Sequence, residues 1–328
     1  SVDVMNAQGA GLFAVSAKIL LDPLKELPEQ PLTFDINDEN LEIFIHFQNG
    51  KYNFIGQKGD TYPQQKPLND NAISISMDAQ MLLNGISRSL FATADDELRP
   101  VMNGVYFDIH TDDLTFVASD GHKLVRLRNL AVKSPERASF ILPKKPANLL
   151  KNLLAKESEQ VLIKFDDNNA YITCTNFEMV CRLIEGRYPN YNSVIPQENP
   201  FKVTIDRISF LNALKRVSVF SNPASSLVKL HLKDSLITVS AQDIDFSTSA
   251  EERIVCQFDG TELSIGFKAT YLIEILGNIS SEEVVLELAD PSRAGLIVPS
   301  ENDEDEDLLM LLMPMMSVSY THLRAHET

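Results

Sequence analysis

The sequence has no uncharged apolar stretch long enough to cross a membrane, which takes about 18 residues or more. Its first residues, SVDVMNAQGAG, lack the basic start and the apolar segment of a signal peptide. Cysteine is scarce and shows no CxxC spacing, since only Cys174, Cys181 and Cys256 are present. An odd number without that spacing favours buried thiols on strands over a disulfide framework or a zinc site. We therefore expect a cytoplasmic protein with no membrane partner.

Catalytic motifs are missing as well. The sequence has no GxxxxGK[ST], GxGxxG, HExxH or GxSxG pattern, so neither a phosphate-binding loop nor a nucleophile elbow is predicted. Three of the six histidines fall at predicted strand positions: His46, His110 and His231. Three pairs of adjacent acids fall in predicted loops, where we expect solvated acids without a partner base: Asp95–Asp96, Asp112–Asp113 and Asp166–Asp167. We predict no catalytic residue, no metal site and no cofactor.

Positive charge is in short supply. Lys and Arg number 29 against 46 Asp and Glu, which gives a formal net charge of −17. Such a balance argues against nucleic-acid binding by the surface as a whole. The segment ENDEDED (301–307) supplies six of the acids and, lying between apolar segments, is predicted to be a solvated loop. A surface that faces nucleic acid would be a local exception, and no helix-turn-helix, zinc-finger or RNA-binding signature predicts base readout.

What the sequence does contain is an internal repeat of two alternating segment types. The first type combines a short strand, a helix-period stretch with lysines and alternating strands, and it occurs three times, at 13–45, 140–174 and 263–298. The second type occurs twice, at 76–120 and 204–243. It opens with an Asp suited to cap a helix, Asp78 or Asp206, and continues with an amphipathic helix and paired strands.

Each repeat joins one helix to several strands, and a helix with one apolar stripe covers one face of an antiparallel sheet. We therefore predict an α+β fold of repeated helix-plus-antiparallel-sheet units, with helices on one face and sheets on the other. The predicted domains are residues 1–76, 77–198 and 199–316, and a tail without a periodic pattern follows at 317–328. Residues 1–76 correspond to only the C-terminal part of a domain, so we expect an N-terminally truncated chain.

The five predicted helices have a net positive charge, although the chain as a whole is acidic. They lie near 15–27, 78–93, 143–156, 205–221 and 265–278, and together they carry +6, which leaves −23 for the rest of the chain. If they share one face, that face is neutral to basic and the strand face is acidic. A basic face attracts a nucleic-acid backbone weakly and without reading bases. The alternative is that these lysines are simply solvated.

The stretch FVASDGHKLV places Asp120, Gly121 and His122 between two apolar runs. Asp-Gly is a strong turn dipeptide, and strand patterns flank it on both sides. A turn is therefore favoured over a catalytic pair, and such a turn can form one wall of a groove. A hydrolase that uses Asp120 and His122 is the least favoured hypothesis.

The sequence resembles the bacterial sliding clamps, the beta subunits of DNA polymerase III. The resemblance covers residues 9–316 and rests on five stretches in the same order and spacing: FVASDGHKL, EGRYPNY, FSNPASSLVKL, IGFKATYLIEIL and LLMPMM. In detail the chain is similar to clamps of the Bacteroides type. The resemblance implies the DNA clamp fold, in which helices line a central channel and sheets form the outside.

The resemblance also implies a function without an active site. A head-to-tail homodimeric ring would encircle double-stranded DNA without sequence-specific contact and confer processivity on the replicative polymerase. The implied partners are DNA, a second copy of the chain, the DNA polymerase III alpha subunit, the clamp loader and other clamp-motif proteins. The alternative is an acidic scaffold that docks peptides and does not encircle DNA.

Residue-by-residue matching implies three sets of site residues. The pocket for short apolar partner motifs would be lined by Met102, Ser119, Gly121, His122, Lys123, Leu124, Pro189, Val194, Ala294, Leu311, Met313, Pro314 and Met315. Methionines suit a shared docking site because they repack around different side chains. DNA contacts would come from Lys18, Lys25, Arg99, Lys144 and Lys145. At the dimer seam, Phe54 of one subunit would meet Val219 and Phe220 of the other.

Three features depart from the family pattern. The DNA-facing loop has Asp95, Asp96, Pro100 and Val101 where aromatic and polar residues are common, which puts DNA contacts from this loop in doubt. Ser193 and Ser292 differ from the commoner pocket residues. The segment SVSYTHLRAHET (317–328) follows the usual end of the family, so we interpret it as a non-native tail that hangs free or obstructs the pocket beside Met315.

Overall fold

The computed structural model describes residues 4–62 and 67–315. The predicted non-native tail at 317–328 lies outside the described residues. The chain forms two compact units, which divide between Pro67 and Leu68. No helix in the described part of the chain combines the length and the apolar character that crossing a membrane requires.

The first unit is a small helix-and-sheet body. It contains α1 (Ala17–Lys25), the strand pair β1 (Phe13–Ala14) and β5 (Gln57–Lys58), and a sheet of β2 (Thr33–Ile36), β3 (Glu42–Phe47) and β4 (Gly50–Ile55). Its buried residues include Ile43 and Ile45 of β3, whereas α1 buries no residue and contains Pro23. Several apolar side chains of this unit therefore stay in contact with water, among them Ile19 and Phe34.

The second unit contains two modules with the same order of elements: strand, helix, four strands, helix, three strands. The first module consists of β6 (Ile73–Asp78), α2 (Ala79–Ser89), β7 (Gly104–Ile109), β8 (Leu114–Ser119), β9 (Lys123–Asn129), β10 (Ala138–Pro143), α3 (Lys144–Leu154), β11 (Gln160–Phe165), β12 (Asn169–Thr173) and β13 (Glu178–Arg182). The second consists of β14 (Phe201–Asp206), α4 (Arg207–Ser218), β15 (Leu227–Lys233), β16 (Leu236–Asp243), β17 (Thr248–Val255), β18 (Leu263–Lys268), α5 (Ala269–Gly277), β19 (Glu283–Leu288), β20 (Gly295–Pro299) and β21 (Glu306–Leu312). This order confirms the repeat that the sequence predicted.

One antiparallel sheet of eight strands runs through both modules, in the order β10-β7-β8-β9-β21-β20-β19-β14. The modules join where β9 pairs with β21, so that Leu127 lies opposite Leu308 and Val125 opposite Met310. Two four-stranded sheets, β13-β12-β11-β6 and β17-β16-β15-β18, complete the unit. The junction between modules is therefore a continuous strand ladder rather than a flexible linker.

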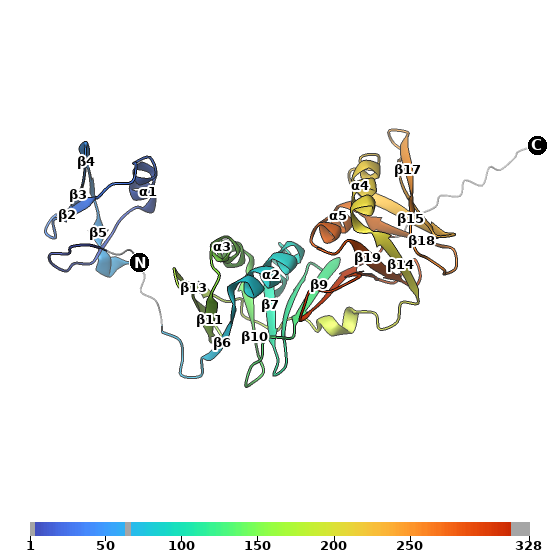
Figure 1. The fold of residues 1–328 in the computed structure, drawn as a ribbon, viewed down its shortest axis with the longest axis horizontal. Coiled ribbons are helices and arrows are strands. Elements are labelled where there is room, and N and C mark those ends of the chain that lie inside the picture. Colours follow the sequence, from blue (N-terminus) through green and yellow to red (C-terminus); the bar gives the residue numbers. More distant parts are fainter. Residues whose placement is uncertain (1–3, 63–66, 316–328) are drawn as a thin grey trace, which may run out of the picture. The chain divides into compact units, whose positions relative to one another are not determined.

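The four helices of this unit lie on the same side of its strands (Figure 1). Helices α2 and α3 pack on strands of the eight-stranded sheet, whereas α4 packs mainly on β15, β16 and β17 of a four-stranded sheet, and α5 contacts β18 and β21. Strand side chains alternate between the two faces. Phe116 belongs to the large core on the helix side, whereas its neighbour Val117 belongs to a separate cluster. Gly85 lets helix α2 lie close to strand β8, because a Cβ atom at this position would lie 2.4 Å from the Phe116 ring. The predicted arrangement of helices on one face is confirmed for this unit.

The two predicted capping residues begin equivalent helices. Asp78 Oδ1 accepts hydrogen bonds from the backbone N–H groups of Gln80 and Met81, at 2.8 and 3.3 Å. Asp206 Oδ1 accepts one from Ser209 N at 2.7 Å, and hydrogen bonds from Ser209 hold the pKa of Asp206 below its ordinary value. A side-chain oxygen at this position satisfies N–H groups that the first turn leaves free.

The acidic run 301–307 is only partly the solvated loop that the sequence predicted. Its last two residues, Glu306 and Asp307, begin β21 and are partly buried. Asp307 Oδ2 lies 2.8 Å from Arg126 Nη2 of β9, and Glu306 Oε1 accepts a hydrogen bond from Asn84 Nδ2 at 2.5 Å. The prediction was wrong for these residues because their partners are more than 180 positions away in the sequence.

The prediction of solvated acid pairs without a base was also wrong for Asp113, which is only 7% exposed. Its Oδ1 lies 3.1 Å from His110 Nδ1, and its Oδ2 accepts a hydrogen bond from Arg128 Nη2 at 3.1 Å. Burial alone would raise the pKa of Asp113, but hydrogen bonds from Arg128, Thr115 and His110 outweigh it and hold the pKa below its ordinary value. His110 itself lies one residue beyond β7, not within a strand as predicted, whereas His46 and His231 lie on β3 and β15.

The cysteines follow the prediction only in part. Cys181 is buried on β13, whereas Cys174 and Cys256 lie just after β12 and β17, and Cys174 is half-buried. Burial raises the pKa of Cys174 and Cys181 to about 11, so both thiols are protonated at neutral pH. All three are free. In residues 4–62 and 67–315, no group of three or more His, Cys, Asp or Glu side chains is placed to hold a metal ion.

Candidate functional site

The turn between β8 and β9 is built by its own polar atoms. Asp120 Oδ1 accepts hydrogen bonds from the backbone N–H groups of His122 and Lys123, at 2.8 and 2.9 Å. Gly121 has a φ of +90°, which side-chain-bearing residues rarely adopt. The His122 ring lies beside the Tyr271 ring, with 6.1 Å between the centroids. Asp120 is therefore used to fix the turn, and it does not form the catalytic pair with His122 that the hydrolase hypothesis requires.

A buried apolar cluster lies on the sheet face opposite the helices, and we call it the outer cluster. It consists of Val117, Leu124, Ile141, Tyr188, Tyr191, Ile195, Ala294, Leu296 and Leu311. Leu311 lies opposite both Leu124 of β9 and Leu296 of β20, so the cluster spans the junction between the modules. Three predicted pocket residues, Leu124, Ala294 and Leu311, thus come together here.

The segment that links the two modules crosses the outer cluster. Tyr191, in the short helix η4 (Tyr191–Val194), is buried in the cluster, and its hydroxyl donates a hydrogen bond to Asp108 Oδ2 at 2.8 Å. Pro189 and Val194, which flank this anchor, are exposed. Burial raises the pKa of Tyr191, so the phenol is a neutral donor. The anchored tyrosine holds two predicted pocket residues at the rim of the cluster.

The end of the described chain runs past the turn. Met313 donates its backbone N–H to His122 O at 2.8 Å, and Met315 donates its N–H to Gly266 O of β18 at 2.8 Å. Met313 therefore lies beside His122, while Met315 lies against the edge of β18. A cavity of about 300 Å³ lies at Met315 and is lined also by Lys229, Ser264, Ile265, Gly266, Pro291 and Ser292.

Met102 is not grouped with the other predicted pocket residues. It is buried in the short helix η3 (Pro100–Met102), outside the outer cluster, and its neighbour Val101 packs against that cluster instead. Ser119 is buried at the turn, where its hydroxyl donates to Lys123 O at 2.9 Å. Both residues are buried and do not line an open surface.

Lys123 is a structural cation, which its sequence position did not reveal. It is 5% exposed, and its Nζ lies 2.8 Å from Glu274 Oε2 of α5 and 3.3 Å from Asp120 Oδ2. The same Nζ lies 4.2 Å from the centroid of the Tyr271 ring, which Lys268 Nζ approaches to 4.6 Å. Tyr271, Glu274 and Lys268 thus belong to the site although sequence reasoning missed them. The only available signal was their place in the stretch IGFKATYLIEIL.

We expect Lys123→Ala to lower the free energy of unfolding by about 2 kcal/mol, because it leaves two carboxylates without their partner and removes a cation from an aromatic face. Urea denaturation followed by circular dichroism measures this change. Lys133→Ala is the control, because Lys133 is exposed and makes no ion pair in the described part of the chain. It should leave the free energy of unfolding unchanged. Equal effects of the two substitutions would contradict the structural role.

The residues predicted to contact DNA are not equally free to do so. Lys144 Nζ lies 2.6 Å from Asp95 Oδ2, and Arg99 Nε donates to Asp96 Oδ2 at 2.8 Å. The hydrogen bond from Arg99 lowers the pKa of Asp96. Lys145 is exposed and makes no ion pair within the described residues, and Lys18 and Lys25 are exposed on α1 of the first unit.

The residues predicted at the dimer seam lie at the surface of their units. Val219 and Phe220 follow α4, and Val219 is 77% exposed. Phe54 lies on β4, an edge strand of the sheet in the first unit. The strand β17 is likewise an edge strand, and alternate residues along it are exposed. Two unpaired strand edges are therefore present on different units of the chain.

Sequence comparison matches these two modules to one family. Residues 76–190 match the model described as the DNA polymerase III beta subunit, central domain. Residues 192–316 match the C-terminal domain of the same subunit. The chain belongs to the DNA polymerase III beta subunit family. The beta sliding clamp of Pseudomonas aeruginosa is 27% identical over 311 residues, which cover 94% of this chain and 83% of that protein.

Solved beta-subunit structures have the same fold. A DNA polymerase sliding clamp from Pseudomonas aeruginosa, crystallised with a ligand, superposes with a TM-score of 0.89 at 27% identity and covers 96% of this chain and 85% of its own. The sliding clamp from Bartonella birtlesii bound to griselimycin gives a TM-score of 0.87 at 27% identity, over 95% and 84% of the two chains. The Bacteroides-type likeness and the truncation stay predictions.

Proposed function

We propose that this chain is a sliding clamp that encircles duplex DNA and tethers the replicative polymerase and other partners, without an active site of its own. The observation that carries the proposal is a pair of like modules, joined by one unbroken eight-stranded sheet, whose helices all lie on the same side of the strands. Adding further modules by the same junction extends one helix-lined wall. A peptide-docking scaffold that does not encircle DNA is not favoured, because it gives no reason for this one-sided helix layer.

The repeat supports a particular way to close the ring. In the element order, β17 corresponds to β9, and β4 of the first unit corresponds to β21, the last strand of its module. Because β9 pairs with β21 within the chain, β17 of one subunit should pair antiparallel with β4 of another. That pairing would give hydrogen-bond partners to the backbone groups of both edge strands. It would also bring Phe54 towards Val219 and Phe220 in a head-to-tail homodimer.

The charge on the helix layer supports DNA as the enclosed partner. Four exposed lysines in or next to the helices of the second unit make no ion pair within the described residues: Lys145, Lys151, Lys156 and Lys215. Cations without protein partners can replace the counterions of a phosphate backbone, and this attraction carries no sequence information. We propose DNA contacts by Lys18, Lys25 and Lys145, and weaker ones by Lys144 and Arg99, which have acidic partners.

Salt dependence tests this assignment. Lys145→Glu should weaken binding of the full chain to a short DNA duplex and should lower the slope of log K against log salt by about 1, whereas Lys144→Glu should have a smaller effect. Fluorescence anisotropy over a salt series gives both quantities. Lys133→Glu, at an exposed lysine outside the helices, is the matched control. If Lys133→Glu and Lys145→Glu change the salt slope equally, the helices do not form the surface that faces DNA.

The outer cluster and the turn at 120–122 are proposed as the docking site for short apolar motifs of the polymerase alpha subunit, the clamp loader and other partners. Exposed Val194, Pro189 and Met313 would contact the motif, while buried Leu124, Ala294 and Leu311 would form the floor. An apolar floor with a polar rim suits partners that share only a few anchor side chains. We also propose a cytoplasmic location and the domain division at 76/77, 198/199 and 316/317.

A further inference from the structure

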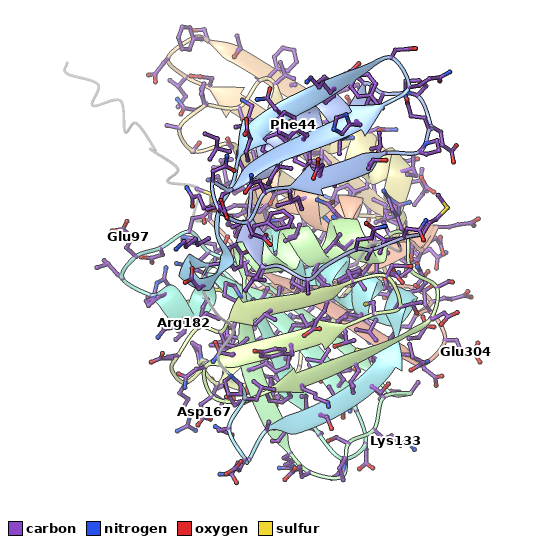
Figure 2. The ribbon with its side chains drawn as sticks, turned by 90° about the vertical axis from the view of Figure 1, so that its left-hand side faces the viewer. Phe44, Glu97, Lys133, Asp167, Arg182 and Glu304 are labelled. Atoms are coloured by element: carbon purple, nitrogen blue, oxygen red, sulfur yellow. The ribbon has the colours of Figure 1, made fainter. Side chains whose placement is uncertain are left out.

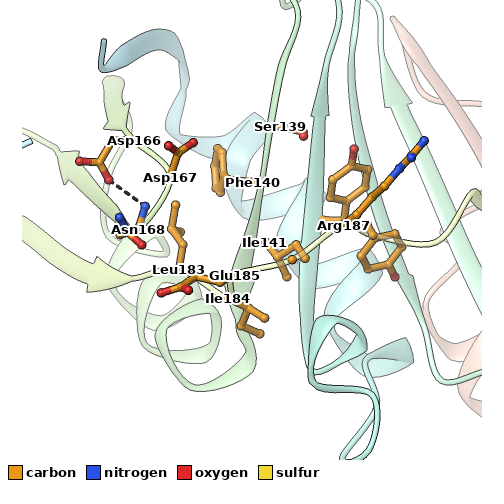
Figure 3. A pocket seen from close by; sticks show the side chains of 13 residues that line it. Ser139, Phe140, Ile141, Asp166, Asp167, Asn168, Leu183, Ile184, Glu185 and Arg187 are labelled. Atoms are coloured by element: carbon orange, nitrogen blue, oxygen red, sulfur yellow. Dashed lines mark hydrogen bonds between the residues drawn. The ribbon is translucent and has the colours of Figure 1, made fainter. Parts of the chain in front are cut away.

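A second groove lies along the outer edge of β10 and borders the proposed docking site at Ile141 and Tyr188. Two cavities of about 320 and 250 Å³ share Ser139, Asp166 and Asp167. The larger one is lined on one side by β10 and on the other by the β11–β12 turn and the segment that follows β13 (Figure 3). Asn69, Asn71 and Ile73 line the smaller one. The two cavities therefore form one groove that follows the edge strand.

Backbone groups of β10 point into this groove. β10 is the terminal strand of the eight-stranded sheet and pairs only with β7. Ile141 O accepts a hydrogen bond from Ile184 N, outside the sheet, at 3.1 Å, and Lys144 N donates to Asn103 O, on the β7 side, at 3.0 Å. In an antiparallel ladder, alternate residues direct both their N–H and their C=O to the same side. Odd-numbered residues of β10 therefore face the groove.

The N–H and C=O groups of Ser139 and the N–H group of Ile141 therefore point to the outer edge of β10. Within the described residues, these three groups make no backbone hydrogen bond outside the β10–β7 ladder. An edge strand with free donors and acceptors is the template on which another extended segment adds as a strand. The groove beside it supplies the space for such a segment.

The acidic residues Asp166 and Asp167 at one end of the groove favour a positively charged ligand. Asp166 is held in place by the backbone N–H groups of Asn69, Asn168 and Asn169, at 3.1, 2.9 and 2.8 Å. Asp167 projects outward from the same turn and makes no ion pair within the described residues (Figure 2). Arg187 lies at the opposite end of the cavity (Figure 3). The end near Asp166 and Asp167 is therefore negative, and the net charge of −17 strengthens attraction for a cation there.

We propose that the β10 edge binds an extended, basic peptide segment of a partner protein, which adds antiparallel or parallel to β10 and places a Lys or Arg beside Asp167. The larger cavity borders the outer cluster at Ile141 and Tyr188, so a partner held at the cluster by an apolar motif could use the β10 edge as a second attachment. Two attachments on one partner raise the effective concentration of each. This surface would favour partners that carry a basic strand-forming segment.

A fluorescein-labelled hexapeptide of alternating lysine and threonine tests the proposal, with the alternating glutamate–threonine peptide as its counterpart. Fluorescence anisotropy with the full chain should show binding of the lysine peptide only. Asp167→Lys should raise its Kd by about tenfold, which corresponds to about 1.4 kcal/mol. Asp112→Lys, at an exposed turn acid elsewhere in the same module, should leave Kd within about twofold. Equal effects of these two substitutions, or equal binding of both peptides, would overturn the proposal.

Strand addition is tested separately from charge. Of two lysine peptides N-methylated on alternate residues, one should lose binding and the other keep it, because only one set of N–H groups faces β10. Ser139→Pro should abolish binding while leaving the circular dichroism spectrum unchanged, since the N–H it removes points away from β7. Binding by both methylated peptides would refute strand pairing. A lower solution mass of Ser139→Pro would show instead that a second copy of the chain occupies this edge.

Discussion

Phe220→Asp is expected to convert the dimer to a monomer at micromolar concentration. Phe220 and Val219 are exposed at the end of α4, where Val219 is 77% and Phe220 41% exposed. In the proposed ring, this apolar pair is covered by the partner subunit around Phe54. A carboxylate buried there without a cation costs several kcal/mol. A head-to-tail ring of two subunits contains this contact twice, so one substitution acts at both seams.

Sedimentation equilibrium over a range of protein concentrations measures the effect. The dissociation constant of the dimer should rise by about a hundredfold or more, since a penalty of about 2.7 kcal/mol corresponds to two factors of ten. Leu98→Asp is the control, because Leu98 is 92% exposed and lies in the other module of the second unit. The proposed seam is wrong if Phe220→Asp sediments like the unchanged chain, or if Leu98→Asp dissociates the dimer equally.

The second large effect is expected at the docking site. Val194→Asp combined with Met313→Asp should weaken binding of an apolar peptide with a Leu-Phe pair by about a hundredfold, because both side chains lie at the rim of the outer cluster and a charge there cannot be desolvated cheaply. Both residues are exposed, so folding should be preserved. Fluorescence anisotropy with a labelled peptide gives the ratio of dissociation constants.

A matched control exists within the same sheet. Leu130 follows β9 at the end away from the turn, and it is 43% exposed, as is Met313. Leu130→Asp should therefore leave peptide affinity within about twofold. If the peptide binds the Val194→Asp, Met313→Asp chain as tightly as it binds the unchanged one, the motif docks elsewhere. The cavity at Met315 would then be the next candidate.

The fold was predictable because its signals are local or repeated. Period-two alternation, capping by Asp78 and Asp206, and the Asp-Gly turn at 120–121 each act within a few residues, and the repeat multiplies them. A helix with one apolar stripe can cover only one sheet face, so similar segments must give a one-sided layer. That reasoning needs no knowledge of which strands pair across the modules.

The errors concern charges whose partners are distant in the sequence. The acids of 301–307 looked like a solvated run, yet Asp307 lies beside Arg126 because β21 pairs with β9. Lys123 looked like a pocket cation, yet Glu274 of α5 and the Tyr271 ring surround it. Whether a charge is exposed or paired depends on strands and helices more than 150 residues away in the sequence, which a local pattern does not contain.

The candidate site was predictable only through the resemblance. Composition and spacing identified the turn at 120–122 but gave no reason to place it near Leu311 or Met313. The structure brings these residues together through the β9–β21 ladder and the bond from Met313 N to His122 O. Met102 was matched to the same pocket but lies outside the outer cluster. The strand residues matched through the resemblance cluster together, and Met102 of η3 does not; the pocket itself stays a prediction.

Retention on circular DNA tests the central claim most directly. The full chain, loaded on nicked circular duplex and separated from free protein by gel filtration at moderate salt, should stay with the circle and leave it within minutes once a single-cutting nuclease makes the DNA linear. Such behaviour requires a closed ring that holds DNA by topology and not by affinity. Equal retention on circular and linear DNA, or none on either, would contradict the claim that like modules with their helices on one face close around the duplex.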